Sequence, residues 1–289
     1  MMLHFNFFRP GWIWLAGLFL LFIGCTSSPF GADEIAPDHR SIQGFAKLQD
    51  TRHYQGIYVW LEGLNQGTRT NENGGFKITL PPEAQLPGVN SLDGTYKLYF
   101  FVANYKTATA QVAIRKGEFL YGEQDLDDKG FLRRPVTLVK ILDIETRVEP
   151  KWARGNSTNP INVITSLQAV NDSVEVLYPN SIGGLIGGIL FRSLETDKVY
   201  LEAADLGLER ALVENVGTFP RSRRYIFSLD RLLVRLPVGN YEVVPYLFIQ
   251  HPEVPEQLIL SLGVNFDEIS ATYLNMPFQR KGGHFRVID

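Results

Sequence analysis

The sequence has 289 residues, a hydrophobic fraction of 45% and a formal net charge of −3 at pH 7. This balance lacks the basic surplus that nucleic-acid-binding domains carry, so we exclude nucleic acid as a partner. Cys25 is the single cysteine, which excludes a disulfide within the chain. The length exceeds one domain of about 150 residues, and two domains are expected.

Residues 1–24 have the pattern of a secretory signal peptide. Arg9 precedes the apolar run Gly11–Gly24. This run is shorter than the about 20 apolar residues that a spanning helix needs, so export is predicted rather than a membrane span. The segment Phe22–Cys25 resembles the lipobox of bacterial lipoproteins, in which a small residue precedes the cysteine that receives the lipid.

The lipobox resemblance implies that Cys25 is lipidated and becomes the first residue of the mature protein. Two acyl chains hold a protein stably on a bilayer, so a firm anchor in membrane lipid and a place in the cell envelope are expected. In a bacterium with two membranes, Thr26 favours the outer one under the same resemblance. A buried structural thiol is the alternative for Cys25. Residues 25–38 are polar, contain proline and glycine, and are predicted to form a flexible lipidated tether.

Residues 39–146 are predicted to form a first β-sandwich. Ser41–Leu48 and Gly56–Gly63 have strand patterns, and Thr68–Ile78 has the glycine and asparagine residues of a tight hairpin. Together with Gly94–Leu98 and Asn104-Tyr105, these segments resemble the carboxypeptidase regulatory-like domain, a sandwich related to transthyretin. The resemblance implies an accessory module rather than an activity, because the chain has no zinc-protease segment.

Both faces of one predicted sheet in this domain are apolar. If Ile57, Val59 and Leu61 face the core, the intervening rings point the other way. Four aromatic side chains then share the outer face: Tyr58, Trp60, Tyr99 and Phe101. We favour contact with the second domain as the role of this face, because a neighbour of suitable size is tethered beside it. The alternative is a platform on which a sugar or a peptide stacks.

Residues 147–160 are polar, contain two prolines, and are predicted to be the interdomain linker. Residues 161–289 are predicted to form a second sandwich of immunoglobulin-like type, with Pro245 placing its strand at a sheet edge. The predicted strands lie near Asn162–Ala169, Ser173–Leu177, Ile189–Ser193, Lys198–Glu202, Arg224–Leu229, Leu232–Leu236, Tyr241–Phe248 and Leu258–Gly263.

Catalytic and metal-binding motifs are not found in the sequence. There is no His-Glu-x-x-His pair and no Gly-x-Ser-x-Gly elbow, so we predict no enzyme, no cofactor and no metal. Asp125–Gly130 begins like a calcium loop, but Lys129 occupies a ligand position, which favours a solvated turn. Gly183–Gly188 lacks the lysine of a phosphate loop and indicates a turn or bulge. Arg221–Arg224 could hold an anion or a lipid headgroup, with a charged loop as the default.

The resulting hypothesis is a membrane-anchored, non-enzymatic envelope lipoprotein that acts as a structural or protein-interaction module. A second hypothesis is a carbohydrate- or peptide-binding lipoprotein that uses the aromatic sheet face. A third is a hydrolase whose site the sequence does not reveal. An interaction module predicts a broad apolar surface, whereas an enzyme predicts converging carboxylates or histidines.

Overall fold

The computed structural model describes residues 39–82, 92–179, 185–203, 212–265 and 269–289. These residues form β-strands with one short α-helix, which confirms the predicted all-β class. The chain divides into two units, residues 1–38 and residues 39–289, and only the second is described. The signal peptide, Cys25 and the tether therefore lie outside the described residues. Within the described part, no helix is long and apolar enough to span a membrane.

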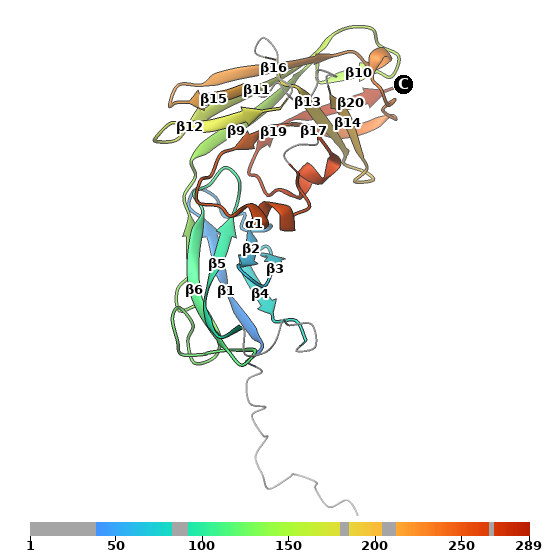
Figure 1. Cartoon of the computed structure of the whole chain (residues 1–289). Coiled ribbons are helices and arrows are strands. Elements are labelled where there is room, and N and C mark those ends of the chain that lie inside the picture. The colour runs from blue at the N-terminus through green and yellow to red at the C-terminus, as the bar shows by residue number, and fades with distance from the viewer. Residues whose placement is uncertain (1–38, 83–91, 180–184, 204–211, 266–268) are drawn as a thin grey trace, which may run out of the picture. The chain divides into compact units, whose positions relative to one another are not determined.

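The first sandwich packs two sheets against one core (Figure 1). One sheet has the strand order β4-β1-β8, and the other has the order β3-β2-β5-β6-β7. Their inward side chains, among them Ile42, Val59 and Phe100, form one buried cluster. The strands are β1 (Ser41–Leu48), β2 (Tyr58–Leu61), β3 (Gln66–Arg69), β4 (Gly75–Thr79), β5 (Gly94–Phe101), β6 (Ala108–Arg115), β7 (Glu118–Phe119) and β8 (Val136–Leu138).

The predicted hairpin at Thr68–Ile78 is wrong, because β3 and β4 belong to different sheets. β3 pairs with β2, whereas β4 pairs with β1. The segment nevertheless contains a tight turn of the kind that glycine and asparagine favour. Gly74 has a φ of 82°, and Asn71 Oδ1 accepts hydrogen bonds from the backbone N–H groups of Asn73 and Gly75. The connection therefore crosses from one sheet to the other.

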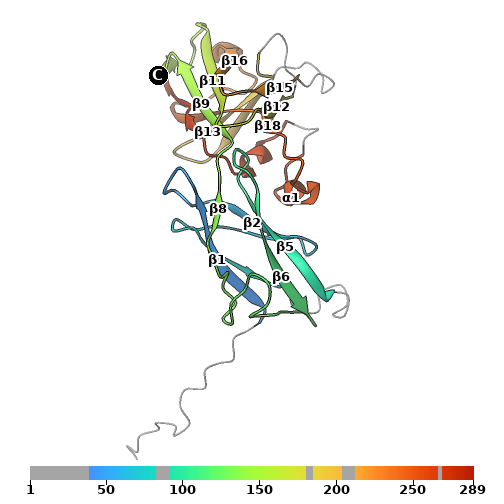
Figure 2. The same cartoon turned by 90° about the vertical axis from the view of Figure 1, so that its left-hand side faces the viewer.

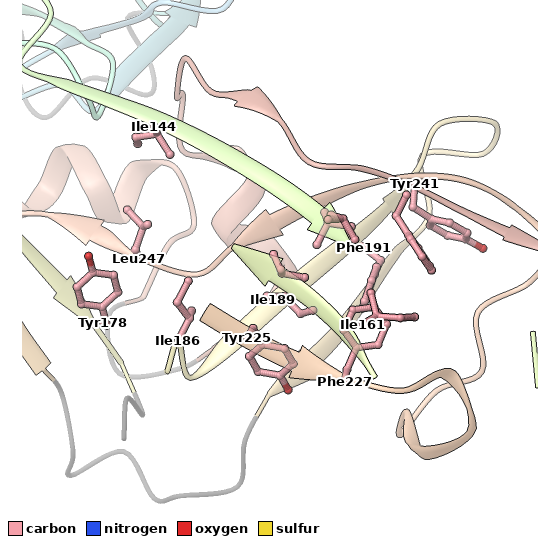
Figure 3. Packing of buried hydrophobic residues seen from close by; sticks show 14 of the residues in the cluster. Ile144, Ile161, Tyr178, Ile186, Ile189, Phe191, Tyr225, Phe227, Tyr241 and Leu247 are labelled. Atoms are coloured by element: carbon pink, nitrogen blue, oxygen red, sulfur yellow. The ribbon is translucent and has the colours of Figure 1, made fainter. Parts of the chain in front are cut away.

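The second sandwich contains three sheets. Its core includes the buried side chains of Ile161, Phe191 and Tyr241 (Figure 3). The strand orders of the three sheets are β10-β20-β17-β13-β14, β16-β11-β9-β19 and β15-β12-β18. The strands are β9 (Leu142–Glu149), β10 (Trp152–Arg154), β11 (Ile161–Ala169), β12 (Val174–Tyr178), β13 (Gly188–Ser193), β14 (Val199–Ala203), β15 (Leu212–Val216), β16 (Arg221–Phe227), β17 (Gly239–Pro245), β18 (Phe248–Ile249), β19 (Lys281–Gly282) and β20 (His284–Ile288). The helices are 3-10 helix η3 (Leu229–Arg231), α1 (Glu256–Ser261) and 3-10 helix η4 (Ala271–Asn275).

The second sandwich begins earlier than the predicted boundary. β9 pairs with β11 along its whole length, and Leu142, Ile144 and Val148 are buried in the second core. Residues 147–160, expected to be a linker, hold the end of β9 and all of β10. The charged residues of β9 alternate with its buried ones and lie on the exposed face of the sheet. In the sequence they resemble the charged residues of a linker, so the strand was missed. The chain crosses between the sandwiches at residues 139–141.

Two predicted strands of the second sandwich are not strands. Leu232–Leu236 has no strand assignment, and Leu258–Gly263 falls largely in the helix α1. Pro255 precedes this helix, and Gly263, with φ of 72°, follows its C-cap, as is typical of short helices.

Pro245 was predicted to lie on an edge strand, and this prediction is wrong. β17 lies inside its sheet between β20 and β13. Pro245 is the last residue of β17 and lies beyond Glu242, the last residue that pairs with β20, so its missing N–H removes no bond from that ladder.

Candidate functional site

The four aromatic side chains of the outer sheet face lie in one buried cluster. Because side chains alternate along a strand, these rings of β2 and β5 lie on the face of their sheet that points away from the first core, as the sequence pattern indicates. Trp60 pairs with Tyr99 across the strands, and their ring centroids are 5.8 Å apart. Phe101, on β5, is 1% exposed. A sugar or peptide therefore finds no open aromatic platform here.

The chain itself covers these rings. Residues in or next to β13, β17, β18, α1 and η4 complete the cluster, and α1 lies on the side of the second sandwich that faces the first (Figure 2). The covering residues are Leu190, Val244, Tyr246, Phe248, Leu258, Ile259, Leu262, Val264, Tyr273 and Met276. We call the whole set, including Tyr58, Trp60, Tyr99, Phe101 and Ala103, the junction cluster.

Hydrogen bonds accompany the junction cluster. The backbone N–H of Ala103 donates to Pro277 O at 2.8 Å, and His251 Nε2 donates to Ala103 O at 2.6 Å. Asn104 exchanges two hydrogen bonds with the backbone of Gln279, both at 2.9 Å. The hydroxyl groups of Tyr58 and Ser261 are 2.8 Å apart. These backbone and side-chain groups at the edge of the apolar contact are thus hydrogen-bonded.

The crossing segment is held by an ionic cluster. Lys140 pairs with both Asp50 and Asp143, and the hydroxyl of Tyr105 donates to Asp50 at 2.6 Å. Burial alone would raise the pKa of Asp50, but the hydrogen bonds from Lys140 and Tyr105 outweigh it and hold this pKa below its ordinary value. Burial and the hydrogen bond to Asp50 raise the pKa of Tyr105. The cluster fixes where the chain passes from β8 to β9.

Beside the junction cluster lies a groove of about 1150 Å³. One wall comes from the first sandwich and the crossing segment, including Phe101, Lys106 and Val139. The rest of the lining comes from β12, β15, β18, α1 and the turns next to them, including Leu177 and Ile259. Ligand sites are often found at such contacts between domains, so this groove is the candidate site.

The lining of the groove contains both apolar and acidic side chains. Among its apolar lining residues, Phe248 and Met276 are buried, whereas Val139 is 40% exposed. The carboxylates that line it are those of Asp172, Glu175, Glu253 and Glu256. Sequence reasoning missed this site, because its residues come from segments up to 175 positions apart and form no local motif.

The first of the three weak sequence motifs, Asp125–Gly130, forms a hydrogen-bonded turn. Asp127 Oδ1 accepts the N–H groups of Lys129 and Phe131, and the bond from Phe131 is the main cause of the lowered pKa of Asp127. The loop is thus an Asx-type turn, and the described residues contain no group of His, Cys, Asp or Glu that could hold a metal.

The arginine motif forms a strand rather than the expected charged loop, because Arg221 to Arg224 begin β16. Arg223 makes two contacts of 2.8 and 2.9 Å with the Glu214 carboxylate, joining β16 to β15. Of the glycine motif, residues 183 and 184 lie outside the described residues, and Gly188 begins β13.

No protein-family profile matches the chain, and no curated protein sequence matches it. Among solved structures, it is similar to BcpA, the major pilin subunit of Bacillus cereus, at 11% identity and a TM-score of 0.26, over 73% of this chain and 66% of that chain. It is also similar to the Bacillus anthracis TIE protein at 10% identity and a TM-score of 0.22, over 73% of this chain and 30% of that one. The matches span less than two thirds of either protein's chain.

Proposed function

We propose that this chain is an exported, lipid-anchored, non-enzymatic protein of the cell envelope that acts as a protein-interaction module. Cys25 would carry the lipid, and residues 26–38 would tether the two sandwiches to the membrane. The first sandwich would be a carboxypeptidase regulatory-like domain in an accessory role, as its strand motifs suggest.

The observation that carries this proposal is the junction cluster. Each sandwich has its own core, yet a third buried cluster is built from both of them. Because the four rings are covered by residues from the same chain, they serve to couple the sandwiches rather than to bind a sugar. Rigid coupling keeps the walls of the groove at a fixed separation, which favours recognition of a partner by a preformed surface.

The anchor is tested by Cys25→Ser. The wild-type protein is expected to incorporate a labelled fatty acid and to fractionate with membranes, because the transferase needs the thiol as its nucleophile. The variant is expected to lose the label. Label retained by Cys25→Ser would reject Cys25 as the anchor.

The interaction role is tested with a photoreactive amino acid in intact cells of the source organism. It is placed at Asn215, which is exposed and lines the groove, or at Lys77, which is exposed on β4 in the first sandwich. A discrete protein adduct from position 215, lost in the Cys25→Ser background, is expected. Position 77 is expected to give none, and equal adducts from both positions would contradict the proposal.

A further inference from the structure

We propose that the groove beside the junction cluster binds an extended segment of a partner protein in which apolar side chains alternate with lysine or arginine. This inference rests on the proposed interaction function and names the chemistry of its partner. Size, lining and charge of the groove each point to it.

The size of the groove fits a stretch of polypeptide. Its volume of about 1150 Å³ exceeds the range of roughly 300–1,000 Å³ typical of small-molecule pockets. The lining reaches from Lys106 in the first sandwich to Asn215 on the edge strand β15. A ligand that contacts both ends must therefore be long, as several residues of a peptide chain are.

The lining of the groove offers apolar contacts. Leu177 lies on β12, next to Phe248 of β18 and opposite Val213 of β15. Val213 is 48% exposed, which leaves apolar surface open beside the groove. Val139 of the crossing segment is 40% exposed and adds apolar surface to the lining. Burying apolar side chains of a partner here would contribute about 25 cal/mol for each Å² removed from water, and this term selects for an amphipathic segment.

The charges around the groove select the sign of the partner. Four carboxylates line the groove, against Lys106, Lys140 and His251. Lys140 is already neutralised by Asp50 and Asp143, and the ring of His251 lies 3.6 Å from Glu253. Among the described residues, Asp172, Glu175 and Glu256 have no ion-pair partner. The surplus of negative charge complements a cationic segment, since complementary potentials favour association and disfavour partners of the same sign.

The experiment measures binding of two fluorescent peptides by anisotropy. One is a decapeptide of alternating leucine and lysine, and the other replaces each lysine by glutamate. The full chain with Cys25→Ser is titrated into each at low and at physiological salt. The lysine peptide is expected to bind, more weakly at the higher salt, and the glutamate peptide at least about tenfold more weakly.

A matched pair of variants separates the groove from the general surface charge. Glu175→Lys changes the groove, whereas Glu145→Lys makes the same change on the exposed face of β9. Glu175→Lys is expected to weaken the lysine peptide about tenfold, and Glu145→Lys less than about twofold. Equal effects of the two variants would mean nonspecific attraction and would overturn the proposal.

Other results also decide against the proposal. Equal affinity for the two peptides, or no binding of either, excludes an apolar–cationic occupant. Self-association of the chain that Glu175→Lys abolishes would identify a second copy as the occupant instead. A groove-specific cellular adduct without any peptide charge preference would keep the interaction function and reject only this partner chemistry.

Discussion

Gly74 is the residue at which the first sandwich depends most directly on the absence of a side chain. Its φ is 82°, and a Cβ atom there would lie 2.2 Å from Ala46 O. Gly56 also has a positive φ, of 86°, but a Cβ atom there meets nothing within 4 Å. Comparing substitutions at Gly74 and Gly56 therefore separates the cost of a positive φ from the cost of steric overlap.

We therefore expect Gly74→Ala to lower the free energy of unfolding by about 3 kcal/mol or more, and Gly56→Ala by only about 1 kcal/mol. Urea denaturation of both variants measures the difference. Equal losses would show that the contact with Ala46 does not constrain the turn.

The ionic cluster at Asp50 predicts a pH dependence. Because the pKa of Asp50 is lowered in the folded protein, its contribution is present above the unfolded pKa and is lost as the pH falls through the folded pKa. Asp50→Asn is thus expected to destabilise the protein at pH 7 and to have a smaller effect below about pH 4. The loss at pH 7 should stay near or below about 1 kcal/mol, because the side chain is 37% exposed. A pH-independent loss would contradict this role.

Single residues were predictable where strand alternation decides their direction. The placement of Tyr58 and Trp60 opposite Val59 follows from the two-residue period of a strand. Asn104 and His251 could not be found in this way. Their roles depend on Gln279 and Ala103, which are distant in sequence, and no local pattern reports such partners.

At the level of elements, the pair Gly282-Gly283 lets the chain change sheets. β19 ends at Gly282 and pairs with β9, whereas β20 begins at His284 and pairs with β17. A Cβ atom on Gly282 would lie 2.1 Å from Thr146 O, and one on Gly283 would lie 2.5 Å from Val243 O. Both residues have positive φ.

We expect Gly282→Ala to cost about 3 kcal/mol or more, because overlap with the β9 backbone adds to the strain of a positive φ. Gly217→Ala is the control, since a Cβ atom there has open space. The control is expected to change the free energy of unfolding by less than about 1 kcal/mol. Thermal unfolding of both variants provides the check, and a similar midpoint for the two would reject the close approach to Thr146.

Elements were predictable where the apolar pattern matched one period and misleading where it matched two. β1 was predicted with its observed bounds, because its alternation continues through eight residues. The run around Leu258 fits a buried strand as well as a helix, and contact with the aromatic rings selects the helix. β9 was divided between a domain and a linker, because its exposed charges resemble those of a loop.

At the scale of the whole unit, the described residues form three buried hydrophobic clusters. Two of them hold one sandwich each, and the junction cluster combines residues of both. Two neighbouring phenylalanines on β5 belong to different clusters. Phe100 is 0% exposed in the first core, and Phe101 is 1% exposed in the junction cluster.

The most direct test of the central claim, that the junction cluster couples the sandwiches, is calorimetry of the chain from residue 26 onward. The wild type is expected to unfold in one transition. Phe101→Ala is expected to divide it into two, because truncating a buried phenylalanine costs about 3–5 kcal/mol and here weakens only the coupling. Phe100→Ala, with a similar loss inside one core, is expected to lower the midpoint of a single transition. Two transitions in the wild type, unchanged by Phe101→Ala, would contradict the account.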